Sequence, residues 1–317
     1  MTIILLLGGL GLIVLGADWL VDGASAIARK AGVSEFVIGL TIVGFGTSCP
    51  ELVVSLTGAF HGNADISIGN VVGSNIFNTF FILGLTALLM PVSMTLENRK
   101  RDIPLTLLVS VLLVCCGMSR TLLGIGASDA ISRPEGVVFL LIFAAYLFYC
   151  FKFDSKEQDG QAEQKVKGLP LAILLVAAGL AGLIFGGDLF VKSATKLARS
   201  IGVSDKFIAI TVLAGGTSLP ELATCVVAAA KHKDQLALGN ILGSNVFNIL
   251  FILGCSAVVT PLSFAGMNLV DAFTLVLSAV LLLFWAYTGH RCRIDRWEGT
   301  VMLLAFGAYY CFLFTNL

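Results

Sequence analysis

Charged residues are scarce in this chain. Asp, Glu, Lys and Arg together make up 13% of the 317 residues, whereas a typical soluble domain contains about 25%. The 20 basic and 20 acidic side chains give a formal net charge of zero, so no nucleic-acid-binding surface is expected. The low charge content indicates that much of the protein surface faces something other than water.

Histidine is also scarce, and cysteine shows no metal-binding pattern. His61, His232 and His290 are predicted at loop ends, and none of the eight cysteines forms a CxxC pair or has a histidine at ligand spacing. We therefore interpret the cysteines as small apolar filler and predict no cofactor. No basic residue precedes the first apolar segment, so we expect that segment to be a membrane span rather than a signal peptide.

Long apolar segments dominate what is present, since 57% of the residues are hydrophobic. Many segments approach the roughly 20 apolar residues needed to cross a bilayer. We predict an all-α polytopic membrane protein with ten transmembrane helices, over 2–28, 34–60, 66–90, 103–124, 134–153, 168–198, 204–230, 236–260, 269–289 and 295–315.

One sizeable hydrophilic segment, from Lys152 to Lys167, divides the chain into two halves. We interpret 154–167 as a cytoplasmic linker, with a first five-helix repeat over 1–153 and a second over 168–317. The first motif region would cover 39–84 and the second 209–254. The linker is too short to hold a sizeable regulatory domain.

The two halves repeat one another at a constant offset of 170 residues. GTSCPEL (46–52) matches GTSLPEL (216–222), and GNVVGSNIFNTFFILG (69–84) matches GNILGSNVFNILFILG (239–254). Such an offset indicates internal duplication. Because five is an odd number of spans, the second copy must be inverted, and inverted repeats are typical of secondary transporters with a binding site near the membrane midplane.

Loop charge gives an expected orientation. One set of loops holds 14 Lys and Arg residues and the opposite set holds six. The positive-inside rule then makes the first set cytoplasmic and places both termini on the extracellular or periplasmic side of the plasma (inner) membrane.

Each motif contains a proline near the middle of an apolar span. Pro50 and Pro220 remove a backbone donor, so we predict that helices 2 and 7 are broken and that carbonyls near Gly44 and Ala214 are free to face a ligand. Broken helix is tolerated at membrane depth only where it lines a cavity or is buried in protein.

Polar side chains cluster around both predicted breaks and on the helix that follows each. Polar groups inside membrane spans are costly and usually functional. Their ligand atoms are all oxygen, which favours a hard cation such as Ca²⁺, and two carboxylates match its charge. The same oxygens can hold Na⁺. The candidates are Glu51, Thr47, Ser48, Ser74 and Asn78 in the first repeat and Glu221, Thr217, Ser218, Ser244 and Asn248 in the second.

Two other duplicated pairs of polar residues are not among these candidates. Asp18 and Asp188 lie outside the motifs, and a structural role and a gating role stay equally open for both. Asn75 and Asn245 directly follow Ser74 and Ser244, about 100° further around the helix. We interpret these two asparagines as packing or capping groups.

The motif pairs GTSCPE with GNVVGSNIFN and GTSLPE with GNILGSNVFN closely resemble the repeats of the calcium/cation antiporter superfamily, and most of all prokaryotic sodium/calcium exchangers and their potassium-dependent relatives. The resemblance covers nearly the whole chain. It implies an antiporter, not an enzyme, that exchanges Na⁺ for Ca²⁺ by alternating access, with the first and sixth helices sliding to switch access.

The resemblance also implies residue roles at four cation sites. The glutamates would bind calcium, with further oxygens from the threonines. The four serines would line the flanking sodium sites, and Asn78 and Asn248 would occupy the central position. Potassium-dependent relatives use Asp where this chain has Asn248, so potassium dependence is disfavoured. Proton-coupled relatives tend to have Asn in place of Thr47 and Thr217, which favours sodium coupling.

Alternatives remain at this point. A proton-coupled Ca²⁺ or general cation antiporter is the closest one. A passive channel and a membrane-embedded enzyme are less favoured, since the halves are duplicated and no catalytic partner accompanies the glutamates. Because one chain holds the whole predicted site, we expect it to function as a monomer.

Overall fold

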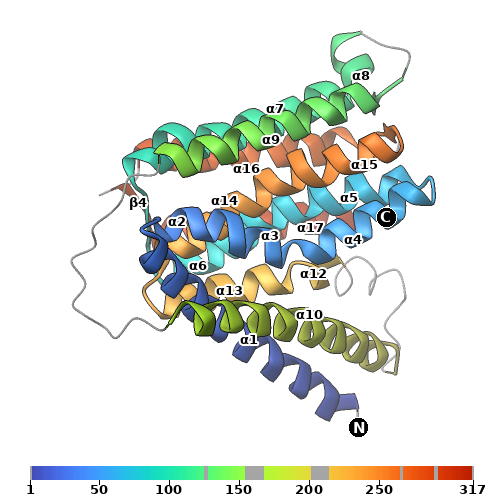
Figure 1. The fold of residues 1–317 in the computed structure, drawn as a ribbon. Helices are drawn as coiled ribbons and strands as arrows, with labels where there is room; N and C mark the ends of the chain where they lie inside the picture. Colours follow the sequence, from blue (N-terminus) through green and yellow to red (C-terminus); the bar gives the residue numbers. More distant parts are fainter. Residues whose placement is uncertain are drawn as a thin grey trace. The chain divides into compact units, whose positions relative to one another are not determined.

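The computed structural model describes residues 2–124, 128–153, 168–200, 214–264, 267–288 and 292–315. Figure 1 shows the described helices and strands. They form two compact units. Unit 1 comprises Met1–Ser48 and Tyr149–Ile241, and unit 2 comprises Cys49–Phe148 and Leu242–Leu317. Each unit therefore combines segments of both sequence repeats, and the boundary in the first repeat lies inside the GTSCPEL motif.

Unit 1 contains two long helices and several short ones. Its elements are α1 (Thr2–Ala31), α2 (Glu35–Ile38), the π-helix η1 (Gly39–Val43), α3 (Gly44–Thr47), α10 (Leu169–Ser200), α12 (Ala214–Gly216), α13 (Leu219–Ala230) and most of α14 (Asp234–Val246). In this unit α1 packs against α10 and α13.

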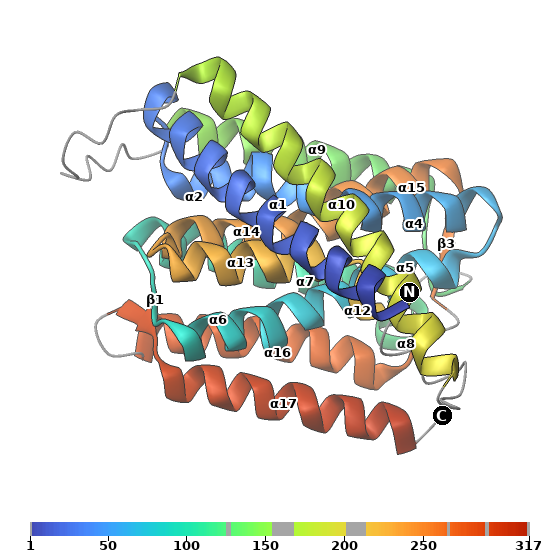
Figure 2. The same ribbon diagram turned by 90° about the horizontal axis from the view of Figure 1, so that it is seen from below.

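Helices α1 and α10 lie side by side and antiparallel (Figure 2). Their contact is made by glycines that allow the two backbones to touch. A Cβ atom built on Gly16 would lie 2.8 Å from the carbonyl oxygen of Gly179, and one built on Gly9 would lie 2.9 Å from that of Gly186. Small residues drive this kind of close packing in membranes. Unit 1 is thus held along α1 by backbone contact rather than by large side chains.

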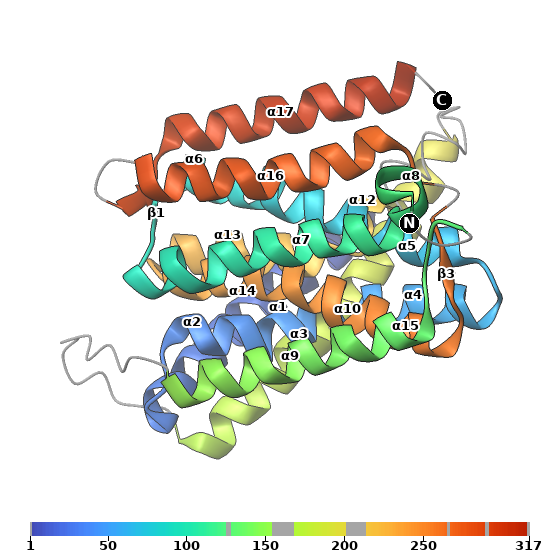
Figure 3. The ribbon, with the colours of Figure 1, turned by 90° about the horizontal axis from the view of Figure 1, so that it is seen from above.

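Unit 2 contains the remaining helices. They are α4 (Cys49–Phe60), α5 (Ala64–Ile76), η2 (Phe77–Ile82), α6 (Leu83–Leu89), η3 (Asn98–Asp102), α7 (Ile103–Gly117), α8 (Ser119–Leu123), α9 (Arg133–Phe153, whose last turn belongs to unit 1), η5 (Phe247–Ile252), α15 (Leu253–Val259), α16 (Leu269–Thr288) and α17 (Arg296–Thr315). Within the unit, α16 packs against α7 (Figure 3), and α17 packs against α6.

Unit 2 also contains two short antiparallel strand pairs, which lie between its helices along the chain. Strand β1 (Val92–Ser93) pairs with β4 (Arg293–Ile294), and β2 (Ala130–Ile131) pairs with β3 (Leu262–Ser263). Each pair joins a strand of the first repeat to one of the second. Strands β1 and β3, and the π-helices η2 and η5, occupy positions that are 170 residues apart, so the duplication in the sequence is visible as matched structure inside this unit.

Helices occupy the predicted ranges wherever these fall on described residues. Seven of the described helices are long and apolar enough to cross a membrane, or eight if Glu35–Thr47 and Cys49–Phe60 form one bent span. The chain is therefore a helical membrane protein, and the ten-span inverted arrangement stays a prediction. The linker 154–167 and the start of the predicted helix 204–230 lie outside the described residues.

Both predicted helix breaks are present. The predicted helix 34–60 is interrupted at Ser48, where the chain bends and φ and ψ are −85° and 7°. The predicted helix 204–230 is interrupted before α13, where Ser218 has φ and ψ of −90° and 9°. In each repeat the break comes two residues before the proline, because proline cannot donate the next helical hydrogen bond and fits best in the first turn of the new helix.

Candidate functional site

The break at Ser48 brings a hydroxyl to a buried carboxylate within unit 1. Ser48 Oγ donates a hydrogen bond to Glu221 Oε1 at 2.9 Å, although the two residues are 173 positions apart. Both side chains are fully or almost fully buried. The other carboxylate oxygen, Glu221 Oε2, is buried and has no hydrogen-bond partner among the described residues. One oxygen of this carboxylate is thus oriented by the protein, and the other is available to a ligand.

Thr47 belongs to a second chain of hydrogen bonds in unit 1. Its hydroxyl donates to Asn240 Oδ1 at 3.1 Å, and Asn240 Nδ2 donates to Cys225 Sγ at 3.2 Å. The Cys225 thiol in turn donates to the carbonyl of Ala237 at 3.7 Å. A hydroxyl that donates its only proton to the protein can present only lone pairs to anything else. The hydrogen bond to Asn240 therefore leaves the lone pairs of the Thr47 oxygen for a further partner.

Our sequence interpretation missed Asn240 and misjudged Cys225. Cys225 is not mere filler, since it orients the amide that holds Thr47. A signal was present, because the second position of the GN motif is Asn in both repeats, as Asn70 and Asn240. The position equivalent to Cys225 is Ser55, and Asn70 Nδ2 donates to its hydroxyl at 3.0 Å within unit 2.

The remaining predicted ligands of unit 1 give a mixed result. The carbonyl of Gly44 is not free as we expected, because it accepts the main-chain N–H of Ser48 at 3.1 Å and lies 3.4 Å from the Thr47 hydroxyl. The short segment α3 is long enough to close this one helical turn before the break. Ala214 begins α12. Ser218 is buried, and Thr217 Oγ1 is a buried oxygen with no partner among the described residues.

Unit 2 carries the other glutamate. Glu51 is completely buried in the first turn of α4. Its main-chain carbonyl accepts a hydrogen bond from Asn70 Nδ2 at 3.1 Å, so Asn70 of α5 is joined to the first turn of α4. Here again an asparagine of the GN motif holds the segment that carries a predicted ligand.

Two further predicted ligands of unit 2 belong to a network of four buried asparagines. Asn78 Nδ2 donates to Asn245 Oδ1 at 3.3 Å, and Asn248 Nδ2 donates to Asn75 Oδ1 at 3.0 Å. Asn75 and Asn245 are therefore more than the packing or capping groups that we inferred, because they contact the predicted ligands directly. Ser74 and Ser244 are also buried, and Ser244 Oγ has no partner in the described part of the chain.

The two duplicated aspartates differ in their surroundings. Asp18 and Asp22 of α1 both form ion pairs with Lys231, at 2.7 and 2.6 Å, within unit 1. Asp188 instead pairs with exposed Lys192 on its own helix, at 2.8 Å. Burial lowers the pKa of Lys231, but its hydrogen bonds to Asp18 and Asp22 outweigh burial and raise the pKa above the ordinary lysine value. Lys231 is therefore a cation throughout the neutral pH range.

Groups suited to soft metals do not gather in the described part of the chain. No cluster of three or more His, Cys, Asp or Glu side chains that could hold a metal occurs there. His61 and His232 are exposed and follow the ends of α4 and α13, as predicted, while His290 lies outside the described residues. The polar atoms around the breaks are carboxylate, hydroxyl and amide oxygens.

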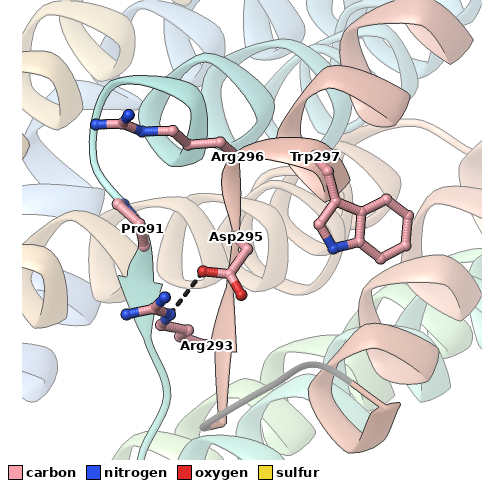
Figure 4. Close-up of a pocket in the computed structure, with 5 residues that line it drawn as sticks. All are labelled: Pro91, Arg293, Asp295, Arg296 and Trp297. Carbon is pink, nitrogen blue, oxygen red and sulfur yellow. Dashed lines mark ion pairs between the residues drawn. The ribbon is translucent and has the colours of Figure 1, made fainter.

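A separate cleft of about 390 Å³ lies where β1 begins, close to the end of β4 and the start of α17 (Figure 4). It is lined by Pro91, Arg293, Asp295, Arg296 and Trp297, and Arg293 pairs with Asp295 at 2.6 Å. Two guanidinium groups against one carboxylate make this cleft unfavourable for a cation. None of the predicted ligands lines it.

Comparison with known proteins identifies a family. Residues 1–152 and 171–315 match the family described as "Sodium/calcium exchanger protein". The match covers both repeats and leaves out the segment that we interpret as a linker.

Individual relatives match over nearly their whole length. The putative antiporter CaxA of Alkalimonas amylolytica is 38% identical over 99% of this chain and 98% of its own. The sodium/calcium exchanger MaX1 of Methanosarcina acetivorans is 35% identical over 98% of both chains. Among solved structures, the sodium-calcium exchanger NCX_Mj soaked with zero Na⁺ and Ca²⁺ superimposes with a TM-score of 0.85, at 33% identity over 98% of both chains.

Proposed function

The chain belongs to the sodium/calcium exchanger protein family, and from this premise we propose that it exchanges Na⁺ for Ca²⁺ across a membrane. Exchange would proceed by alternating access to a cation site near the membrane midplane. We propose that one chain is sufficient and that the protein acts in the plasma membrane, with both termini outside.

The observation that carries the proposal is a set of buried oxygens that lack a hydrogen-bond partner among the described residues. A buried polar atom without a partner costs about 1–3 kcal/mol, so such atoms are rare unless a ligand meets them. Five of them belong to residues that we selected from the sequence: Glu221 Oε2, Thr217 Oγ1, Ser244 Oγ, Asn78 Oδ1 and Asn248 Oδ1. All five atoms are oxygens with lone pairs, so each can coordinate a cation.

We propose the following roles on this basis. The two glutamates supply the negative charge that balances Ca²⁺, and the hydroxyl and amide oxygens complete its shell or hold Na⁺ in its place. Two carboxylates cannot neutralise Ca²⁺ and several Na⁺ ions together, so the ions would compete and exchange would follow. The proposed ligands are Glu51, Glu221, Thr47, Thr217, Ser48, Ser218, Ser74, Ser244, Asn78, Asn248 and the main chain near Gly44 and Ala214. The Gly44 carbonyl accepts the N–H of Ser48 and keeps a second lone pair for a cation.

Sodium is the proposed coupling ion. Threonine at positions 47 and 217 favours it by the resemblance described above. In addition, Thr47 is held by Asn240 with its lone pairs available, and a neutral hydroxyl oxygen suits Na⁺ without taking up or releasing a proton. A proton-coupled antiporter is the second candidate.

Calcium uptake into proteoliposomes tests the proposal. Vesicles loaded with Na⁺ are diluted into Na⁺-free and K⁺-free buffer at equal pH, and uptake of radioactive Ca²⁺ is followed. We expect uptake that disappears when Na⁺ is present at equal concentration on both sides. Uptake only under an imposed pH gradient would replace sodium with proton coupling, and no uptake under either gradient would contradict calcium antiport.

Substitution of the glutamates tests the proposed ligands. We expect Glu51→Gln and Glu221→Gln each to reduce Ca²⁺ transport by at least about 100-fold, because each removes one of two charges that balance the ion. Glu298→Gln is the matched control, since Glu298 is equally buried but accepts a hydrogen bond from the main chain of Asp295. Wild-type transport in both glutamate variants would show that the site is elsewhere.

A further inference from the structure

Four buried asparagines in unit 2 connect the two sequence repeats reciprocally. Asn75 of the first repeat accepts a hydrogen bond from Asn248 of the second, and Asn245 of the second accepts one from Asn78 of the first. All four side chains are about 1% exposed. Positions 75 and 245 are equivalent in the two repeats, and so are 78 and 248, because each pair is 170 residues apart. The same hydrogen bond is therefore made in both directions between the repeats.

The direction of these hydrogen bonds determines what Asn78 and Asn248 can present. A side-chain amide has a donor NH₂ group on one side and an acceptor oxygen on the other. Because both NH₂ groups are directed at Asn245 and Asn75, both oxygens point elsewhere. Asn78 Oδ1 and Asn248 Oδ1 are indeed buried without a hydrogen-bond partner among the described residues.

Asn75 and Asn245 are themselves anchored, which fixes the direction of the whole network. Asn75 Nδ2 donates to the main-chain carbonyl of Asn245 at 3.1 Å, an atom that can only accept. Asn245 Nδ2 donates to the hydroxyl of Thr79 at 2.8 Å. The repeats differ here because the position equivalent to Thr79 is Ile249, which has no acceptor, and Asn75 therefore uses a main-chain atom instead.

The local backbone supports a functional role for this network. Asn78 and Asn248 each occupy the second position of a π-helix, η2 and η5. Single π-helical turns within α-helices are rare and occur frequently at functional sites. The network and the two π-helices together place both amides in a setting that neither repeat would form alone.

We propose that Asn75 and Asn245 are positioning residues that turn the carbonyl oxygens of Asn78 and Asn248 toward the transported cation. The proposal rests on the proposed function, in which Asn78 and Asn248 are cation ligands. It goes further by assigning the direction of their amides to two residues that do not touch the ion. With the NH₂ group of each amide directed into the network, the carbonyl oxygen is the group that each amide presents to the cation.

Alanine variants test the proposal in proteoliposomes, with half-saturating Na⁺ and Ca²⁺ concentrations and maximal rate measured separately. We expect Asn75→Ala and Asn245→Ala to raise the half-saturating cation concentration about fivefold to tenfold, the change expected for one lost buried hydrogen bond. Asn98→Ala is the matched control, because Asn98 is equally buried in unit 2 and makes two side-chain hydrogen bonds, to Thr95 and Asp102. It should leave the half-saturating concentrations unchanged.

A double-mutant cycle separates positioning from general destabilisation. If Asn75 acts through Asn248, adding Asn75→Ala to Asn248→Ala should cause little further loss, because coupled residues are not additive. Thr79→Val is a milder variant that removes only the acceptor of Asn245 Nδ2, and we expect it to raise the half-saturating concentration in the same direction.

The outcomes distinguish this inference from the proposed function. Wild-type behaviour of Asn78→Ala and Asn248→Ala would overturn the proposed ligand roles themselves. A different result would overturn the positioning role alone. In that case Asn78→Ala and Asn248→Ala would be impaired, which agrees with their proposed ligand roles. The variants that disturb the network would behave like the control Asn98→Ala; these are Asn75→Ala, Asn245→Ala and Thr79→Val. Additive losses in the cycle would overturn the positioning role as well.

Discussion

Ser48 and Glu221 are joined by a hydrogen bond of 2.9 Å from the serine hydroxyl to the carboxylate. One residue lies at the break of the first repeat, and the other lies one turn beyond the break of the second. The bond therefore ties the two duplicated motifs together inside unit 1. It also orients the carboxylate so that its second oxygen stays unpartnered.

Replacing Ser48 with alanine should weaken cation binding. Ser48→Ala removes the hydrogen bond to a charged partner, which contributes about 1.5–3 kcal/mol, so we expect the half-saturating Ca²⁺ concentration to rise by at least tenfold. Ser110→Ala is the control, since the hydroxyl of buried Ser110 donates to the carbonyl of Thr106 in its own helix and has no other hydrogen bond among the described residues. Equal behaviour of the two variants in the uptake assay would contradict the role of Ser48.

The thiol of Cys225 should matter through the amide that it orients. Cys225→Ala removes the acceptor for Asn240 Nδ2, so the amide can turn and release Thr47. We expect the half-saturating cation concentration to rise about threefold to fivefold. Cys225→Ser should retain more of the affinity, because Ser55 accepts the equivalent bond from Asn70.

Two comparisons check this prediction. Cys255→Ala, in the half-buried part of α15 outside the hydrogen-bond chain, serves as the control for losing a thiol. If Cys225→Ser and Cys225→Ala are equally impaired, the acceptor is not what matters. Loss of volume would then be the cause.

Even one added methyl group at Gly16 should disturb the pairing of α1 with α10. In Gly16→Ala the new Cβ would meet main-chain atoms of Gly179 and Leu183 at 2.8 Å, and backbone cannot move aside as a side chain can. We expect a loss of about 1–3 kcal/mol in the free energy of unfolding, measured by thermal denaturation in detergent. Gly11→Ala is the control because no atom lies within 4 Å of its added Cβ; a similar loss there would disprove the contact.

Removing the charge of Lys231 should loosen α1 from the end of α13. Lys231→Met breaks the ion pairs to Asp18 and Asp22, whose side chains are 46% and 37% exposed. Because water screens such charges, we expect the free energy of unfolding to fall by about 0.5–1 kcal/mol. The raised pKa of Lys231 means that this stabilisation is present at neutral pH and is lost only when the pH rises above the ordinary lysine range.

Salt and a second lysine check the prediction for Lys231. The effect of Lys231→Met on thermal denaturation should shrink at high salt, which screens partly exposed charges. Lys192→Met should have almost no effect, because Lys192 and Asp188 are exposed neighbours on one helix. A salt-independent loss in Lys231→Met would point to packing of the lysine stem instead.

Local patterns in the sequence were enough to predict the helices and both breaks. Apolar length indicates a membrane span wherever it occurs, and Pro50 and Pro220 interrupt a helix whatever surrounds them. The duplicated motifs likewise singled out Glu51 and Glu221, and both are buried as expected for functional groups in a membrane helix. These features depend on residues close together in the chain.

Contacts between distant segments could not be predicted in this way. Three contacts depend on how the helices pack. They are the approach of Gly16 to Gly179, the hydrogen bond from Thr47 to Asn240 and the hydrogen bond from Asn248 to Asn75. The sequence by itself determined the class of protein, its duplication and the kind of atoms available to a cation. Only the tertiary structure decided which of those atoms are oriented and which have no partner among the described residues. The reason is that the side-chain hydrogen bonds of Ser48, Thr47 and Asn248 join residues more than 100 positions apart.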